Sequence, residues 1–323
     1  MKPLIALLAL LPCVASAADE LKLKATVPLP GVKGRFDHFA VDTNAHRIFV
    51  AALGNNTLEV IDGAAAKRLH TITGLRKPTG VAFLSEANQI VVANGDDGTV
   101  KVFDGTNYKL LKNITGLDDA DNVRLDAKAH MIYVGYGDGA LAALDAKTFE
   151  QVGTIKLKAH PESFQLEQRG PRIFVNVPDA KHIAVVDRDK RAIIGTWPMD
   201  KFRANFPMAL DEAKHLLFVG CRQPARLVVF DTTAGKAAAN LAISSDTDDL
   251  FYDATRRRLY VSCGEGFLDV VAVLEGDRYE RSTRVSTRSG ARTCFFSSEL
   301  GQVSLAAPQR DNQDAEIRIY QPE

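Results

Sequence analysis

The chain lacks an excess of charge of either sign. Its 323 residues include 40 lysines and arginines and 40 aspartates and glutamates, so the formal net charge is zero. A strongly basic surface of the kind that binds nucleic acid is therefore excluded for the chain as a whole. The composition, 46% hydrophobic and 25% charged, also excludes disordered and collagen-like chains. The length alone leaves one large domain or two ordinary ones open.

Long apolar stretches are also missing. The N-terminal run Leu4–Leu11 is too short to span a bilayer, which takes about 20 apolar residues. Lys2 precedes this run, and Ala15-Ser16-Ala17 follows it with the small-x-small pattern of a cleavage site. These features predict a signal peptide over residues 1–17 and not a retained membrane anchor. We expect an exported protein, periplasmic or secreted, with no membrane span after cleavage.

Cysteine is rare. The chain has four, and three of them follow the predicted cleavage site: Cys221, Cys263 and Cys294. An odd number leaves at least one thiol free or bound to another chain. There is no CxxC pair or cysteine–histidine cluster to indicate zinc, and no CxxCH motif to indicate covalent haem. We expect the three residues to be small buried thiols.

The sequence does contain a repeat. Short β-rich runs end at Val50, Val92, Val134, Val175, Val219, Val261 and Leu305, which are 41 to 44 residues apart. A second series follows each run by about a dozen residues, and its early members end in aspartate, as in LEVID at Asp62 and VKVFD at Asp104. Turn residues such as Gly54-Asn55-Asn56 separate the two series, which is the pattern of hairpins. A period in the low forties with several short strands per unit predicts a β-propeller.

Each unit divides into four strands, which we name A to D. In the first unit these are residues 39–41, 48–51, 58–61 and 69–72. The seventh unit has no D strand, because the chain stops after residues 317–320, whereas the extended N-terminal segment 23–29 belongs to no unit. This segment can complete the seventh blade and remove the open edges that invite aggregation. The sequence therefore predicts an all-β fold, a single seven-bladed propeller domain over residues 18–323.

The hairpin of the first unit carries a resemblance to a known family. Residues 49–62 read FVAALGNNTLEVID, and residues 91–95 and 260–262 are weaker copies. The hairpin resembles that of the exported YVTN-repeat (YncE-like) propellers, whose repeat runs as aromatic-Val-small-polar, a Gly-Asn turn and Val-x-Val-Ile-Asp. The resemblance covers essentially the whole mature chain and implies the fold. It transfers no catalytic residue, since the family spans binding proteins, surface proteins and relatives of lactonases and haem d1 propellers.

The channel mouth is where we expect a ligand, because the loops that enter the inner A strands meet there. One residue per unit just before the A strand forms a first ring: Asp37, Thr79, Asp121, Glu162, Phe206, Asp248 and Arg292. The next residues include His38, Asn122 and Asp249. Four of the seven positions in the first ring are acidic. The candidate ligand-binding residues are Arg35, Asp37, His38, Asp121, Asn122, Glu162, Asn205, Phe206, Asp248, Asp249 and Arg292.

The acidic mouth allows two kinds of chemistry. The carboxylates with Asn122 form an oxygen-rich set suited to Ca²⁺ or another hard cation, and a divalent cation is the cofactor that they indicate. The candidate metal ligands are Asp121, Glu162, Asp248 and Asp249. The imidazole of His38 instead suits a transition metal, or serves as a general base. The candidate catalytic residues are His38, Glu162, Asp248 and Asp249. Alternatively, the mouth is polar only because water fills it, and Arg35, Arg203 and Arg292 neutralise its carboxylates.

Most of the remaining histidines indicate no ligand site. His46, His130 and His215 share one position in the A–B turns of alternate units, on the opposite face, where we expect a turn role. The others are single and peripheral in this arrangement. His160 adjoins the mouth through Pro161-Glu162 and is a distant candidate.

No catalytic constellation stands out on this scaffold. We therefore expect foremost a monomeric, exported binding protein that recognises a small molecule or a protein partner at its top face, and no binding of nucleic acid. A metal-assisted hydrolase of the lactonase type, in which a bound cation polarises a carbonyl, is the alternative. A redox accessory protein related to haem-carrying propellers is a weaker one, because the mouth offers no methionine and no histidine besides His38 as a ligand.

Overall fold

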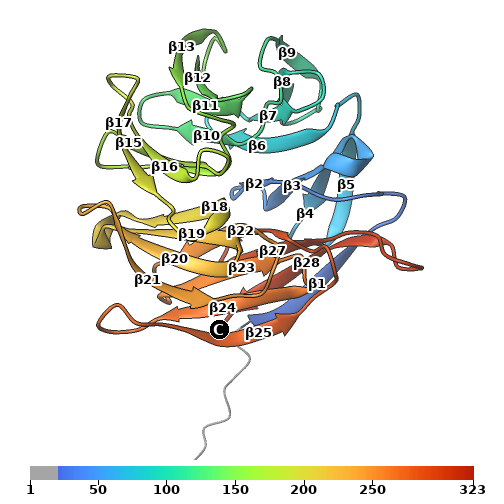
Figure 1. Cartoon of the computed structure of the whole chain (residues 1–323). Helices are drawn as coiled ribbons and strands as arrows, with labels where there is room; N and C mark the ends of the chain where they lie inside the picture. The colour runs from blue at the N-terminus through green and yellow to red at the C-terminus, as the bar shows by residue number, and fades with distance from the viewer. Residues whose placement is uncertain (1–20) are drawn as a thin grey trace, which may run out of the picture.

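Seven four-stranded antiparallel sheets form a ring in the structure, a computed structural model that describes residues 21–323 (Figure 1). Six sheets follow the order of the chain from the inner to the outer strand. This arrangement confirms the predicted all-β, seven-bladed propeller. Within residues 21–323, no helix has the length and apolar character needed to cross a membrane. The signal peptide predicted over residues 1–17 lies outside the described residues.

The strands of each blade run from A to D. Blade 1 has β2 (Phe39–Asp42), β3 (Arg47–Ala52), β4 (Thr57–Asp62) and β5 (Lys67–Ile72), close to the predicted bounds. Blade 2 has β6 (Pro78–Leu84), β7 (Gln89–Asn94), β8 (Thr99–Asp104) and β9 (Leu110–Ile114). Blade 3 has β10 (Val123–Asp126), β11 (Met131–Tyr136), β12 (Ala140–Asp145) and β13 (Gln151–Lys156). Blade 4 has β14 (Phe164–Leu166), β15 (Arg172–Val177), β16 (His182–Asp187) and β17 (Ala192–Pro198).

The last three blades continue this order. Blade 5 has β18 (Arg203–Asp211), β19 (Leu216–Gln223), β20 (Ala225–Asp231) and β21 (Lys236–Ala242). Blade 6 has β22 (Thr247–Asp253), β23 (Arg258–Cys263), β24 (Phe267–Val273) and β25 (Tyr279–Ser286). Blade 7 has β26 (Thr293–Ser297), β27 (Gln302–Ala307), β28 (Ala315–Pro322) and, at its outer edge, β1 (Leu21–Leu29). Two short 3₁₀ turns lie at Leu53–Asn55 and Glu212–Lys214.

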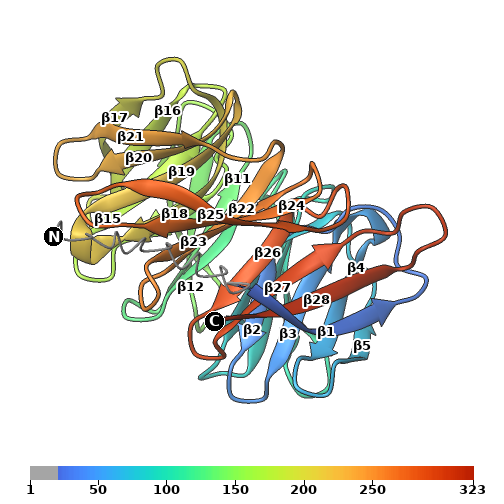
Figure 2. The same ribbon diagram turned by 90° about the horizontal axis from the view of Figure 1, so that it is seen from below.

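The first and last strands of the described chain close the ring. β1 pairs antiparallel with β28, from Leu21 opposite Pro322 to Leu29 opposite Ala315 (Figure 2). Val27 and Leu29 are fully buried in a cluster that joins blade 7 to blade 1. The prediction that the N-terminal segment completes the seventh blade is therefore confirmed.

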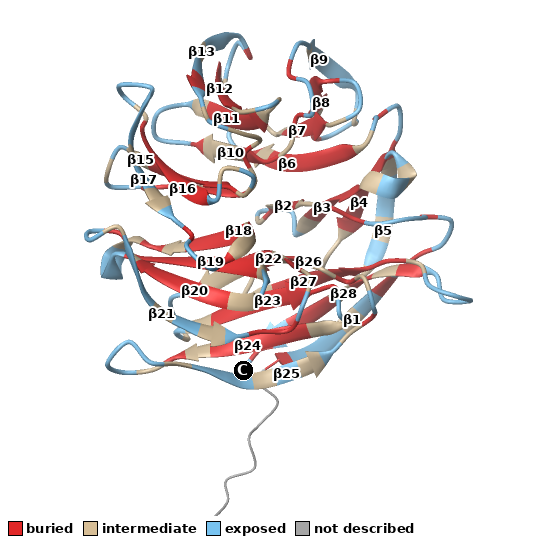
Figure 3. Cartoon of the chain, in the orientation of Figure 1, coloured by how far each residue is buried: buried red, intermediate tan, exposed pale blue. Residues whose placement is uncertain are grey.

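Burial follows the position of each strand in its blade. The middle strands B and C are almost wholly buried, whereas D strands such as β5 and β9 expose much of their surface (Figure 3). The cores lie between adjacent sheets, so each blade is stabilised by its neighbours and not by itself. Cys221, Cys263 and Cys294 are free and buried in these cores, as predicted.

The aspartate at the end of each early C strand has a local role. Asp62 Oδ1 accepts hydrogen bonds from the backbone N–H groups of Ala64 and Ala65, at 3.0 and 2.8 Å, and Asp104 and Asp145 repeat this arrangement. Such bonds stabilise a tight turn, so the repeated aspartate specifies the C–D hairpin.

The histidines of the A–B turns are also structural. His46, His130 and His215 have φ angles of 53°, 53° and 57°, the left-handed conformation that closes a turn. The predicted turn role is therefore confirmed. These histidines lie away from the channel mouth.

The closure can be tested at Leu29. Leu29→Ala removes a fully buried side chain from the cluster between blades 7 and 1 and should lower the free energy of unfolding by about 2–5 kcal/mol. We expect one cooperative denaturant transition that moves as a whole, measured by circular dichroism. Lys22→Ala, exposed on the same strand, is the control and should change stability by less than about 0.5 kcal/mol. A small early transition followed by an unchanged main one would contradict closure by β1.

Candidate functional site

Polar side chains gather where the chain enters the inner strands. A cavity of about 200 Å³ lies at this mouth of the central channel. Eight of the residues proposed from sequence line it: Arg35, Asp37, His38, Asp121, Asn122, Glu162, Phe206 and Asp248. They come from blades 1, 3, 4, 5 and 6, so the cavity exists only because the ring is closed.

The repeat places three of the carboxylates in equivalent positions. The backbone N–H groups of Asp37, Asp121 and Glu162 donate to the B-strand carbonyls of Ala51, Gly135 and Asn176, at 2.8, 2.8 and 2.9 Å. Because these three blades make the same bond, their carboxylates converge on the channel axis.

Gly80 allows Asp121 to approach blade 2. A Cβ atom at Gly80 would lie 2.1 Å from the carbonyl oxygen of Asp121, so glycine is needed there for steric reasons. Thr79 Oγ1, beside it, donates to the carbonyl of Ala120 at 2.8 Å. These contacts hold the backbone of Asp121 against the neighbouring blade.

His38 lies among three carboxylates. Its Nε2 atom is 3.5 Å from Asp37 Oδ1 and 4.0 Å from Asp121 Oδ1, and its Nδ1 atom is 3.5 Å from Asp249 Oδ1. The other oxygen of Asp249 accepts the backbone N–H of Cys294 at 2.9 Å. Burial alone would lower the pKa of His38, but Asp37 and Asp249 outweigh it and raise the pKa to about 10.

His160, a distant candidate from its sequence position beside Pro161-Glu162, is a second histidine of the mouth. Its Nδ1 atom hydrogen-bonds the carbonyl oxygen of Gly137 at 2.7 Å, and its Nε2 atom is 3.8 Å from Asp121 Oδ2. The interaction with Asp121 raises the pKa of His160 to about 9 against the effect of burial. In turn, burial would raise the pKa of Asp121, but His160 and His38 hold it below its ordinary value.

The surroundings of two other carboxyl groups raise their pKa values. Burial raises the pKa of Glu162 to about 8, and the nearby carboxylates of Asp121 and Asp248 add to the effect. Burial likewise raises the pKa of Asp37 to about 7, with His38 opposing it. The mouth thus contains acids that retain protons near neutral pH.

Arginines neutralise part of the mouth. Arg35 Nη2 donates to Asp37 Oδ2 at 3.2 Å, and Arg222 donates to Asp248 Oδ1. Arg222 was not singled out from sequence, because it lies near the end of the B strand of blade 5, at a position that no repeat rule marks. Its guanidinium carbon also lies 4.1 Å from the centre of the Phe206 ring. Lys77 and Asp119, which sequence reasoning also missed, complete the cavity wall.

Several expected residues lie elsewhere. Asn205 is fully buried and donates to Asn176 Oδ1 at 2.8 Å, so it joins blades 4 and 5. Arg292 pairs with Asp246 at 2.8 Å. Arg203 donates to the carbonyl of Phe202 at 2.9 Å and so does not neutralise the mouth carboxylates as expected.

Asp249 lies just beneath the mouth. It lines a second cavity of about 410 Å³ along the central channel, where aromatic and aliphatic side chains of the A strands prevail. Its two oxygens are engaged by His38 and by the backbone of Cys294. Asp249 therefore supports His38 from below and does not open into the mouth cavity.

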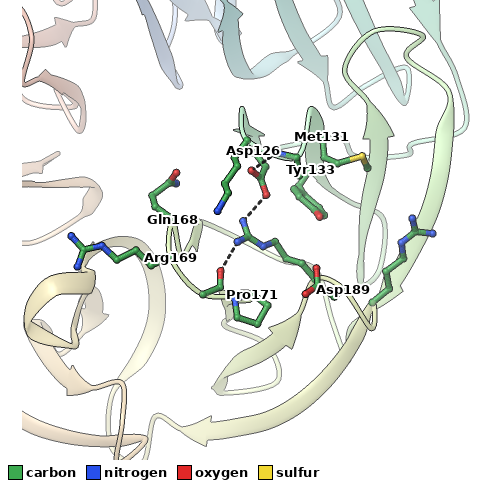
Figure 4. Close-up of a pocket in the computed structure, with 12 residues that line it drawn as sticks. Asp126, Met131, Tyr133, Gln168, Arg169, Pro171 and Asp189 are labelled. Carbon is green, nitrogen blue, oxygen red and sulfur yellow. Dashed lines mark hydrogen bonds and ion pairs between the residues drawn. The ribbon is translucent and has the colours of Figure 1, made fainter.

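A further cavity, of about 630 Å³, lies near the A–B turns of blades 3 and 4 (Figure 4). Its central feature is Arg188, which donates to Asp126 Oδ2 at 2.6 Å and to the carbonyls of Glu167 and Gly170 at 2.7 and 2.5 Å. These bonds tie the two blades together and leave Arg188 committed to structure. We therefore place the candidate site at the mouth, in spite of its smaller volume.

Neither a protein-family model nor a curated protein sequence matches the chain. Solved structures do match. A chain of the structure titled "Crystal Structure of Mitotic Checkpoint Complex" has a TM-score of 0.78 at 13% identity, over 99% of this chain and 98% of that one. A chain of Kuenenia stuttgartiensis hydrazine synthase has a TM-score of 0.73 at 15% identity, over 88% and 99%. At such identities the likeness shows the propeller fold alone.

Glu162→Gln should flatten the pH dependence of stability. The pKa of Glu162 is raised from 4.5 to about 8 in the folded protein, so the unfolded chain releases this proton first. The wild type therefore loses stability as the pH rises between these two values. Glutamine is neutral at every pH, so the variant should melt several degrees above the wild type at about pH 8 and close to it at about pH 4.

Thermal unfolding by circular dichroism at several pH values measures this difference. The raised pKa values of His38 and His160 give the wild type a further loss of stability at higher pH, and Glu162→Gln also removes one of the charges that raise the pKa of His160. Glu86→Gln, exposed on a turn of the opposite face, is the control and should follow the wild type. A Glu162→Gln protein that melts below the wild type at about pH 8 would show that the carboxylate is ionised and stabilising.

Proposed function

We propose that the chain is an exported binding protein that takes a positively charged ligand in its channel mouth. One observation carries this proposal: the cavity has five carboxylates and three permanent cations. These are Asp37, Asp119, Asp121, Glu162 and Asp248 against Arg35, Lys77 and Arg222. Without ligand, protons on His38, His160 and Glu162 offset the excess, and a cationic ligand can take over this role.

The volume of the mouth limits the size of the ligand. Sites for drug-sized molecules occupy about 300–1,000 Å³, and this cavity has about 200 Å³. It suits a metal ion, an ammonium group or a guanidinium group. A protein partner would fit by inserting one basic side chain, whereas an extended polymer would not enter.

The contacts of the catalytic candidates favour binding over hydrolysis. His38 and Asp249 pair with each other, and Asp248 accepts from Arg222. A general base needs a free lone pair directed at the substrate. Glu162 is the candidate that retains such an oxygen, and its proton is lost only at about pH 8.

Export is the part of the proposal that rests on sequence alone. Lys2, the apolar run Leu4–Leu11 and Ala15-Ser16-Ala17 support it as the parts of a signal peptide. The three buried thiols need no disulfide partner and are compatible with an oxidising compartment.

A cation panel tests the mouth. Ca²⁺, Zn²⁺, spermidine and arginine amide are added separately to the purified protein, and the melting temperature is recorded. We expect at least one of them to raise it by several degrees, because a ligand that binds only the folded state stabilises it. Asp121→Asn removes the central carboxylate and should abolish the shift.

Glu86→Gln, on the opposite face, serves as the control and should keep the full shift. The proposal is wrong if no cation stabilises the wild type, or if Asp121→Asn responds as strongly as the wild type does.

A further inference from the structure

We infer that the cation of this mouth is a divalent transition metal, held at two adjacent positions that share Asp121 as a bridging ligand. This inference rests on the proposed function, which assigns a cationic ligand to the mouth, and it names the class of cation. The first position is formed by Asp37, His38 and Asp121, and the second by Asp121, His160 and Glu162.

The orientation of both imidazoles is the first support. A histidine that binds a metal through one nitrogen usually directs its other N–H at a carbonyl or carboxylate, which fixes the ring. His160 directs Nδ1 at the carbonyl oxygen of Gly137, 2.7 Å away, and His38 directs Nδ1 at Asp249 Oδ1, 3.5 Å away. Both rings therefore present Nε2 to Asp121, each to a different oxygen of the carboxylate.

The separations between ligand atoms are the second support. In each trio these atoms lie within 4.8 Å of one another, and the Nε2 atoms lie 3.5 to 4.0 Å from the carboxylate oxygens. Two ligands on opposite sides of a zinc ion are about 4.2 Å apart, and tetrahedral ligands are closer, about 3.4 Å. Small side-chain rotations are enough to reach these distances. His38 faces Oδ1 of Asp121 and His160 faces Oδ2, so the carboxylate can serve both positions.

An unpartnered polar atom is the third, independent support. Asn122 lines the cavity and is only 1% exposed. Its side-chain oxygen Oδ1 is buried and has no hydrogen-bond partner. Leaving a buried acceptor unsatisfied costs about 1–3 kcal/mol. A metal ion, or a water molecule bound to one, would satisfy it. The ionised carboxylates of the two trios only accept hydrogen bonds, so they cannot satisfy this oxygen.

The donor set selects the kind of metal. Ca²⁺ takes six to eight oxygen ligands, whereas each trio here supplies one imidazole nitrogen and two carboxylates. Imidazole together with carboxylate suits Zn²⁺, Mn²⁺ or Co²⁺ better. Two of the four metal ligands expected from sequence have other partners in the structure. Asp248 is neutralised by Arg222, and Asp249 supports His38 from behind. Asp121 and Glu162 remain as metal ligands from that set.

Metal stoichiometry tests the inference. Chelator-treated full-length mature protein is incubated with Zn²⁺, passed through a desalting column and analysed by inductively coupled plasma mass spectrometry, and Co²⁺ loading is followed by visible absorption. We expect about two ions per chain in the wild type and none in Asp121→Asn. His38→Gln and His160→Gln each remove one trio and should each retain about one ion.

Two further variants act as matched controls. Glu86→Gln alters an exposed carboxylate on the opposite face and should keep both ions. Asp249→Asn removes only the support behind His38 and should weaken one position by about 10–100-fold. Circular dichroism establishes that each variant is folded, and the two single-histidine variants decide the question if Asp121→Asn does not fold.

The outcomes separate this inference from the proposed function. If the wild type binds no Zn²⁺ or Co²⁺ but is stabilised by Ca²⁺, spermidine or arginine amide, the metal inference falls and the cationic mouth stands. If no cation of any kind binds, both fall. One ion per chain that survives His160→Gln unchanged would overturn the bridged arrangement, and so would two ions retained by Asp121→Asn.

Discussion

The pairing of β1 with β28 is the contact on which the rest of the structure depends. It joins the beginning and the end of the described chain along the whole length of Leu21–Leu29. Without it, blade 7 would present an open edge, and the cluster between blades 7 and 1 would lose Val27 and Leu29. Closure also sets the radius of the channel. Side chains that are separated by about 40 or 80 residues in sequence thereby come within hydrogen-bonding or ion-pairing distance at the mouth.

Closure has an electrostatic consequence. The repeat gives blades 1, 3 and 4 the same backbone hydrogen bond at the entry to the A strand, and each of these blades carries an acidic residue at that position. Asp37, Asp121 and Glu162 are brought together in this way, and bringing like charges into a buried site is unfavourable. The molecule offsets this by protonated histidines, by raised carboxyl pKa values and by Arg35 and Arg222. A bound cation would replace these compensations with one interaction.

The period of the repeat explains what could be predicted from sequence. The blade count, the closing strand and the ring of residues from Asp37 to Asp248 all follow from counting along equivalent units. His160 and Arg222 do not, because they lie in a loop before the A strand and at the end of a B strand, where the units differ in length and conformation. Arg292 occupies the expected register but turns to Asp246, a partner that periodicity does not reveal.

The two ends of the propeller differ in how their carboxylates are satisfied. On the face of the A–B and C–D turns, aspartates such as Asp62 and Asp145 accept backbone N–H groups two and three residues away, which satisfies them within the turn itself. At the mouth, Asp121 finds its partners His38 and His160 across blades, and Asn122 keeps a buried oxygen with none. Carboxylates that accept hydrogen bonds within their own turn stabilise that turn and need no partner from another blade. Groups that converge from distant blades and stay incompletely satisfied are costly to stability, and this cost is most simply explained if they serve a ligand.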